Sequence, residues 1–156
     1  MSALFSSCGQ YRYRLKRQLT GTTGPLLLIG LNPSTADASR NDPTIRRCIG
    51  FADLWGHSEL VVTNLFSFRA TKPTELKAAD APIGPETDAI LLEEAQRAGR
   101  ILVAWGMHGG FQNRDRAVLK LLSPFDLSCL GKTKAGFPRH PLYMRANTQP
   151  VPYSPK

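Results

Sequence analysis

Apolar residues along the chain form four short runs, each interrupted or followed at once by small or polar residues. The runs cover residues 26–31, 60–66, 101–105 and 127–130. Runs of this length are too short for typical helices, and they are typical of strands buried in a parallel sheet. Apolar residues recur at helical spacing between and after these runs, over residues 43–55, 74–79, 86–98 and 113–122.

This alternation predicts a three-layer α/β/α sandwich with a central, mostly parallel four-stranded sheet. Residues 11–17 alternate with a period of two, with Tyr11, Tyr13 and Leu15 on one face and lysine or arginine on the other. That pattern predicts an antiparallel edge strand at the N-terminal side of the sheet. We expect residues 1–149 to form a single α/β domain and residues 150–156 to form a flexible C-terminal tail.

The charge balance narrows the class of partner. Lys and Arg number 20 against 12 Asp and Glu in 156 residues, which gives a net charge of +8. A strongly basic domain favours a polyanionic partner, with nucleic acid or a nucleotide first, although a basic surface without a specific partner is the alternative. No apolar run approaches the roughly 18 residues of a membrane span. Three scattered cysteines indicate neither a disulfide framework nor a metal site, so we expect the protein to lie in the reducing cytoplasm. We also expect a monomer.

Several common chemistries are not supported by any motif. The chain has no phosphate-binding loop of the Walker type, no dinucleotide fingerprint and no nucleophile elbow. It also lacks the histidine and cysteine spacings that hold zinc. We therefore expect no metal and no cofactor.

Small and polar residues follow the first two strands of the predicted sheet. The first strand ends at Gly30 and continues into Asn32, Pro33 and Ser34, and Asn64 stands near the end of the second. Ligands of parallel sheets bind outside the carboxyl ends of the strands, so these residues are candidates for a site. Pro33 restricts the backbone before it, which would hold the amide of Asn32 rigidly with its donors and its carbonyl available.

The loops after the third and fourth strands carry further candidates. Trp105, Gly106 and His108 follow the third strand, and His140 and Tyr143 lie beyond the fourth. A lone histidine is more often structural than catalytic, but two histidines in loops at the carboxyl ends favour a functional role. Trp105 is better explained as a core residue than as a platform for base stacking, whereas Tyr143 beside His140 is a better candidate for stacking on a base.

Two aspartates lie in the polar loop after the first strand. Asp42 precedes Pro43, and an acidic residue followed by proline is the usual start of a helix, so we favour a capping role for it. Asp37 could position a water molecule.

Basic side chains in the same set of loops could contact phosphates. Arg69 and Lys72 follow the second strand, and Lys132, Lys134 and Arg139 follow the fourth. Basic loop residues are also commonly just solvated, and the sequence leaves both interpretations open.

The motifs resemble a domain family of unknown function from bacteria and phages over about residues 8–145. The resemblance rests on residues 30–36, 42–44, 64–66, 82–85 with Asp88, 105–106 and 140–143. It carries no activity with it.

The order of the motifs is also similar, more distantly, to the uracil-DNA glycosylase superfamily. Residues 30–33 (Gly-Leu-Asn-Pro) resemble the Gly-x-Asn-Pro motif of mismatch-specific glycosylases, and residues 140–141 resemble the His-Pro motif. The resemblance implies that Asn32 positions the hydrolytic water, that Asn64 reads the base and that His140 assists its departure. The family's His-Pro-Ser-x-Leu-Ser loop is here His-Pro-Leu-Tyr, and the four-cysteine cluster pattern of some branches is missing.

Three functions therefore compete. The first is a protein that recognises or excises DNA bases by hydrolysing the N-glycosidic bond. The second is a nucleic-acid-binding module on the same fold without catalysis. The third is an enzyme that acts on a small nucleotide or nucleoside. Convergence of Asn32, Asn64 and His140 on one pocket is the observation that would favour the first.

Overall fold

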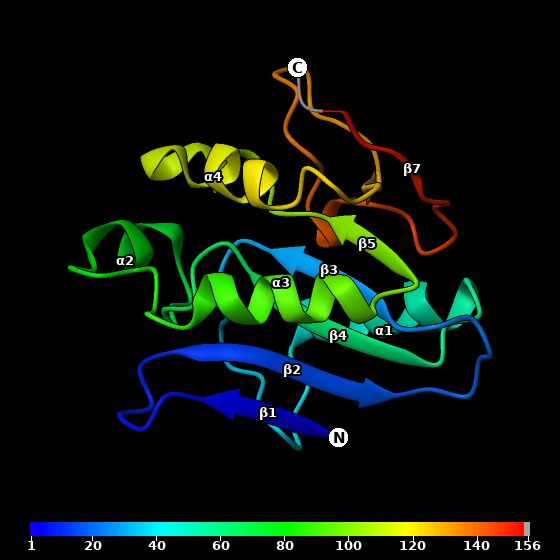
Figure 1. The fold of residues 1–156 in the computed structure, drawn as a ribbon, viewed down its shortest axis with the longest axis horizontal. Coiled ribbons are helices and arrows are strands. Elements are labelled where there is room, and N and C mark those ends of the chain that lie inside the picture. Colours follow the sequence, from blue (N-terminus) through cyan, green and yellow to red (C-terminus); the bar gives the residue numbers. More distant parts are fainter. Residues whose placement is uncertain (155–156) are drawn as a thin grey trace.

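The computed structural model describes residues 1–154, which form a mixed seven-stranded sheet with helices on both faces (Figure 1). The strand order is β1-β2-β4-β3-β5-β6-β7. The strands are β1 (Ser2–Phe5), β2 (Arg12–Gln18), β3 (Leu26–Gly30), β4 (Glu59–Asn64), β5 (Arg100–Val103), β6 (Ser128–Cys129) and β7 (Val151–Pro152). The central strands β4, β3, β5 and β6 run parallel, whereas β1, β2 and β7 are antiparallel to their neighbours.

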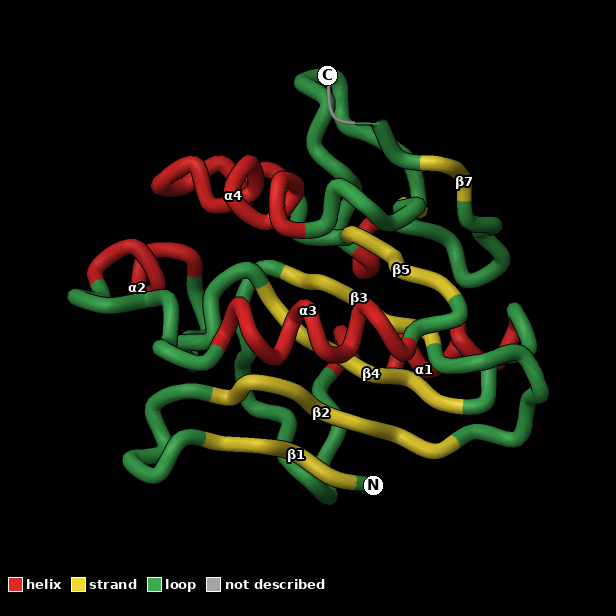
Figure 2. The backbone as a smooth tube through the Cα atoms, viewed as in Figure 1, coloured by secondary structure: helices red, strands yellow, loops and turns green. Residues whose placement is uncertain are grey.

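Four α-helices occur in the described chain, and they divide between the two faces of the sheet (Figure 2). They are α1 (Pro43–Leu54), α2 (Pro73–Ala78), α3 (Thr87–Arg97) and α4 (Arg114–Leu121). The helices α3 and α4 pack on the face that holds Leu27 and Ile29 of β3, and α1 packs on the opposite face with Leu26 and Leu28. Successive strand residues point to opposite faces, so the continuous apolar run of β3 supplies both cores.

The predicted mixed α/β architecture is thus confirmed in outline, and the sheet is larger than the sequence indicates. The N-terminal strand β2 is not at the edge, because β1 pairs outside it. In addition, β7 lies within the segment expected to be a flexible tail. It pairs with β6, and the N–H of Tyr153 donates to the carbonyl of Leu127. The two strands that the sequence does not predict, β1 and β7, are short, and β7 contains a proline. Neither sequence therefore shows a clear alternation of apolar and polar residues. Residues 155–156 of that tail lie outside the described residues.

The helix α1 begins where the sequence predicts. The side chain of Asp42 accepts a hydrogen bond from the N–H of Ile45 at 2.9 Å, and Pro43 occupies the first turn. This cap satisfies one of the free N–H groups at the start of the helix. Trp55 follows its last turn, and Gly56 takes a positive φ of 78°. No described helix has the length and apolar composition that a membrane span requires.

A bulge in β2 decides which face of the sheet receives Arg12. Leu4 pairs with Arg14, but Phe5 pairs with Arg12, so Tyr13 is an extra residue on β2. A bulge reverses the alternation of side chains beyond it and often occurs beside functional sites. Arg14 accordingly points to the α3 face, where it pairs with Glu94, whereas Arg12 points to the α1 face. The simple alternation of residues 11–17 wrongly places both arginines on one exposed face.

Candidate functional site

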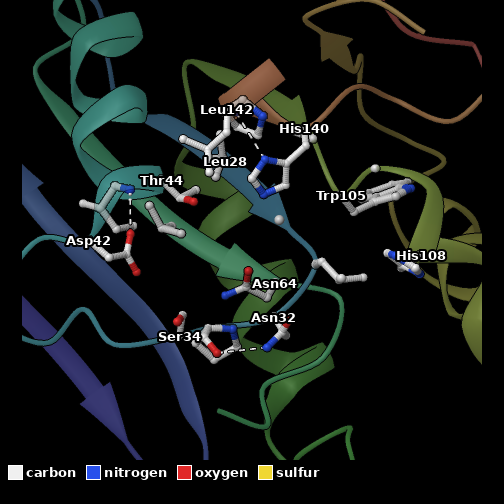
Figure 3. Close-up of a pocket in the computed structure, with 18 of the residues that line it drawn as sticks. Leu28, Asn32, Ser34, Asp42, Thr44, Asn64, Trp105, His108, His140 and Leu142 are labelled. Atoms are coloured by element: carbon white, nitrogen blue, oxygen red, sulfur yellow. Dashed lines mark hydrogen bonds between the residues drawn. The ribbon is translucent and has the colours of Figure 1, made fainter. Parts of the chain in front are cut away.

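A cavity of about 500 Å³ opens at the carboxyl ends of β3, β4 and β5, on the α1 face of the sheet (Figure 3). Its walls come from the loop after β3, the first turn of α1, the segment after β5 and the 3₁₀ turn Pro141–Tyr143. The volume lies within the range of about 300–1,000 Å³ that is usual for small-molecule sites.

Three residues from distant parts of the sequence meet in this cavity. Asn32, Asn64 and His140 all line it. In Figure 3, His140 lies at one end, Asn32 and Ser34 lie at the other, and Asn64 lies between them. The convergence expected for a base-excising site is therefore present.

The side-chain amide of Asn32 joins two loops. Its Nδ2 donates to the carbonyl of Pro33 at 3.0 Å and to that of Ala70 at 2.8 Å. Both donors are thus used within the protein, and among the described residues the Oδ1 accepts no hydrogen bond. The sequence predicts available donors at this position, but the fold leaves only the carbonyl oxygen. An oxygen that can only accept is suited to hold the O–H of a water molecule.

The side chain of Asn64 has room at its position only because residue 30 has no Cβ. A Cβ at Gly30 would lie 2.8 Å from the Oδ1 of Asn64, which is closer than normal contact. The side chain of Asn64 is buried, and its Nδ2 has no hydrogen-bond partner within residues 1–154. A buried amide without a partner is costly, so this donor is available to a ligand or to water.

The imidazole of His140 is held in one tautomer. Its Nδ1 accepts a hydrogen bond from the N–H of Leu142 at 3.2 Å, so the neutral ring carries its proton on Nε2. Burial lowers the pKa of His140 from its usual value, and the charge of Asp42 opposes this shift. A neutral donor at Nε2 is thus the form that the fold favours at neutral pH.

Arg12 and Asp42 also line the cavity, and the sequence does not assign a site role to either. Arg12 is only 2% exposed, and its Nη1 donates to the carbonyl of Ala36 at 3.1 Å. Its Nε is buried and has no hydrogen-bond partner in the described part of the chain. Burial lowers the pKa of Arg12 to about 10, and Asp42 partly offsets that effect. The capping role of Asp42 is confirmed, and its place on the wall follows from the position of α1 above the strand ends.

Asp37, the other candidate aspartate, is used in a local turn. Its Oδ1 accepts from the N–H groups of Ser39 and Arg40, at 3.0 and 2.8 Å. These bonds lower the pKa of the Asp37 carboxyl. Asp37 does not line the cavity.

All the other predicted substrate-binding residues are at the cavity, but with different exposures. Gly30, Pro33, Ser34, Trp105, Gly106, His108 and Tyr143 belong to its walls. The ring of Trp105 is nevertheless a core group, 1% exposed and packed edge-on against Tyr153. Tyr143 is 81% exposed and lies 5.8 Å from the imidazole of His140. Together with the exposed Met107 and Leu142, it forms an apolar rim.

One predicted phosphate contact lies beside the cavity. Arg69 lines a shallow groove of about 270 Å³ together with Arg40, and the groove shares Ser34, Thr35, Ala70 and Thr71 with the cavity. The guanidinium of Arg69 lies 4.8 Å from the centre of the Phe5 ring and donates to the carbonyl of Gly9. Its orientation is therefore fixed before any ligand binds.

The other predicted phosphate contacts do not line the cavity. Lys72 precedes α2, and Lys134 is exposed. The Nζ of Lys132 donates to the carbonyl of Ser154, and the Nε of Arg139 donates to that of Lys132. Within the described residues, no group of three or more His, Cys, Asp or Glu side chains is arranged to hold a metal ion.

Comparison with known proteins identifies a family but not an activity. Neither a curated protein nor a solved structure matches the chain. The family model described as "Protein of unknown function (DUF1643)" matches residues 12–142, which include every residue of the cavity wall except Tyr143. The chain therefore belongs to the DUF1643 family.

Proposed function

We propose that the cavity binds a nucleobase and that the protein hydrolyses the N-glycosidic bond of that base in DNA. The observation that carries this proposal is the meeting of Asn32, Asn64 and His140 in one cavity. We also infer a fold of the uracil-DNA glycosylase type, because the motifs that resemble this superfamily follow successive strands and line a common site.

The chemistry needs two polar groups on opposite sides of the scissile bond. As the bond between C1′ and the base nitrogen breaks, its electron pair leaves with the base, and the sugar develops oxocarbenium character. The Nε2–H of His140 donates to the base, where negative charge develops. The Oδ1 of Asn32 holds the water that adds to C1′. That water supplies the hydroxyl group of the sugar, and the proton that it releases neutralises the base.

The surroundings of the cavity suit a nucleic-acid strand. A base extruded from DNA must be enclosed while its phosphates remain outside. The exposed Tyr143 and Leu142 at the rim offer apolar surface to neighbouring bases. The guanidinium groups of Arg40 and Arg69 in the adjoining groove can contact the backbone phosphates.

The test uses single- and double-stranded oligonucleotides that carry one uracil, one hypoxanthine or one mismatch. We expect abasic product from at least one of these substrates. We also expect Asn32→Ala and His140→Ala each to lower the rate by about 100-fold or more. Asn147→Ala is the matched control, because Asn147 is exposed and does not line the cavity.

The alternatives give different results in the same experiment. Absence of abasic product from every substrate, at protein concentrations that saturate the DNA, would exclude the glycosylase. Salt-dependent binding that survives both substitutions would instead identify a non-catalytic binding module. Turnover of free nucleosides, together with weak oligonucleotide binding, would identify an enzyme that acts on a small nucleotide or nucleoside.

A further inference from the structure

Three residues of the cavity wall carry a buried hydrogen-bond donor that has no partner among the described residues: the Nε of Arg12, the Nδ2 of Asn64 and the Nε1 of Trp105. The indole of Trp105 belongs to the core on the α3 and α4 face. Arg12 and Asn64 are 2% and 5% exposed. Folded proteins satisfy nearly all their buried polar groups, so these two donors beside one cavity require an explanation. A bound ligand that supplies acceptors at this wall provides one.

The neighbouring Arg17 shows that the fold can satisfy a buried arginine on this strand. Arg17 is also 2% exposed, and it lies on the α1 side of β2, where it contacts the loop after β3. Its Nε donates to the Oδ1 of Asn41, and its Nη1 and Nη2 donate to the carbonyls of Lys16, Asp37 and Arg40. Arg12 holds the same loop through Ala36 alone. The Nε of Arg100, away from the cavity, is also buried without a partner among the described residues. What distinguishes Arg12 is that it lines the cavity, where a ligand could accept from its Nε.

The charge of Arg12 is also poorly compensated. Among the described residues that line the cavity, Asp42 is the only one with a carboxylate, and one of its oxygens caps α1. The bulge in β2 brings the guanidinium to this place, because regular alternation would turn it to the α3 face. A buried cation without an ion-pair partner favours an anionic ligand.

We propose that Arg12 is a ligand-contacting residue and that, with Asn64, it stabilises a planar heterocyclic base as an oxygen-centred anion. This assignment rests on the proposed function for the identity of the ligand as a base. It restricts the substrate to bases whose ring nitrogen is conjugated to a carbonyl, because the electron pair that leaves with such a base is shared with the carbonyl oxygen. Arg12 and His140 then act on the departing base together, and Asn32 acts on the sugar side.

The test measures binding and does not require cleavage. The probes are barbiturate, a planar pyrimidine that is anionic at neutral pH, and uracil, which is similar in shape but neutral. We expect barbiturate to bind at least about tenfold more tightly than uracil by calorimetry at pH 7, because a hydrogen bond to a charged acceptor is stronger. Arg12→Met should abolish this preference.

One variant controls for a change in folding, and a second tests Asn64. Arg17→Lys alters a buried arginine on the same strand whose three guanidinium nitrogens all have partners, and it should keep the preference for barbiturate. Asn64→Asp keeps the shape of Asn64 but adds a negative charge, and it should weaken barbiturate binding more than uracil binding.

Each outcome either supports or overturns the proposal. Equal binding of the two probes, or a preference that persists in Arg12→Met, would overturn it. Inorganic phosphate that binds as tightly as barbiturate and competes with it would show a general anion site and would also overturn it. Anion preference without any cleavage of DNA would retain this inference and reject the proposed function. Cleavage without the preference would do the reverse.

Discussion

On the face covered by α3 and α4, the buried charged side chains Glu94 and Arg114 each have an oppositely charged partner, whereas on the α1 face the buried cation Arg12 lines a cavity. Glu94 on α3 is 2% exposed and binds Arg14, Lys16 and Arg97. Arg114 is 4% exposed, and it donates to the carbonyl of Leu65 and pairs with Asp88.

Arg12 is as deeply buried as these groups, but among the described residues its guanidinium donates only to the carbonyl of Ala36. The energetic consequence differs between the two faces. A paired buried charge stabilises its partners, and removing it leaves them without compensation. An unpaired buried charge costs free energy in the folded state, and such groups are concentrated at functional sites. We therefore infer that the α3 and α4 face (the closed face) contributes mainly to stability and that the α1 face (the open face) serves the proposed binding.

The largest expected effect is on the free energy of unfolding, and it should differ between substitutions of Arg114 and Arg12. Arg114→Met should lower the free energy of unfolding by about 3 kcal/mol, because the carbonyl of Leu65 loses its buried donor and Asp88 loses its partner. Arg12→Met should lower it by less than about 1 kcal/mol, because the lost bond to Ala36 is offset by the removal of a buried charge.

Urea denaturation measures both changes. The control Arg116→Met alters an exposed arginine on the same helix α4, and its effect should stay within about 0.5 kcal/mol. If Arg12→Met costs as much as Arg114→Met, the two faces do not differ, and Arg12 is a structural residue.

The second prediction concerns the contact between Gly30 and Asn64. In Gly30→Ala, the new Cβ would lie 2.8 Å from the Oδ1 of Asn64 and would displace that side chain within the cavity. The proposed cleavage should slow by about 100-fold, as expected when a positioned group moves by a fraction of an ångström to an ångström.

A glycine in α1 is the control for that substitution. A Cβ at Gly50 meets no other atom within 4 Å, so Gly50→Ala should leave the rate unchanged. It should also raise the free energy of unfolding by up to about 1 kcal/mol, because alanine favours the helix. A normal cleavage rate in Gly30→Ala would show that the position of Asn64 does not matter.

A smaller effect is expected from pH. The pKa of His140 is lowered by burial, so between its usual value of 6.5 and its lower folded value the unfolded chain binds a proton that the folded chain does not. The free energy of unfolding should therefore fall as the pH is lowered through that window. Protonation also converts Nδ1 from an acceptor into a donor, so the hydrogen bond that it accepts from the N–H of Leu142 is lost.

His57 contributes to the same dependence, because burial lowers its pKa as well. His140→Gln should consequently remove only part of the slope, and His57→Gln should remove the other part. The free energy of unfolding is measured between pH 5 and pH 7, a range that includes the usual histidine pKa of about 6.5. Comparing the two variants separates the contributions of His140 and His57 to the pH dependence. A slope that His140→Gln leaves unchanged would contradict the neutral state assigned to this ring.

The parts of the site that the sequence predicts are those that depend on local pattern. The apolar run before Asn32 ends at a strand tip, and the Asp42–Pro43 pair begins α1, because neighbouring residues decide both features. The carboxyl ends of parallel strands then have to meet at one edge of the sheet. Asn32, Asn64 and His140 could therefore be placed together without a structure.

The parts that it does not predict depend on contacts between distant segments. The amide of Asn32 is turned by Ala70, which lies 38 residues away. The side of the sheet that Arg12 faces depends on a bulge against β1, and residues 11–17 show only regular alternation. The place of Arg12 on the cavity wall and the orientation of Asn32 consequently could not be predicted from the sequence.

The smallest expected effect tests whether the open face is also the side that nucleic acid approaches. Arg40 and Arg69 line the groove beside the cavity, and Phe5 already orients the guanidinium of Arg69. If a DNA phosphate lies in this groove, each of Arg40→Gln and Arg69→Gln should weaken DNA binding only a few-fold. Each should also reduce the slope of log affinity against log salt by about one unit.

The matched control is Lys120→Gln, because Lys120 is an exposed cation on α4, on the closed face. It changes the net charge by the same amount as Arg69→Gln, so an effect of overall charge alone would appear equally in both variants. Binding to a series of oligonucleotides at increasing salt separates the two cases. Equal slopes for Arg69→Gln and Lys120→Gln would mean that DNA does not distinguish the two faces. A slope reduced only by Arg40→Gln and Arg69→Gln would place the DNA phosphates in the groove beside the cavity. This is where the backbone of a strand would lie if one of its bases were held by Asn64 and Arg12.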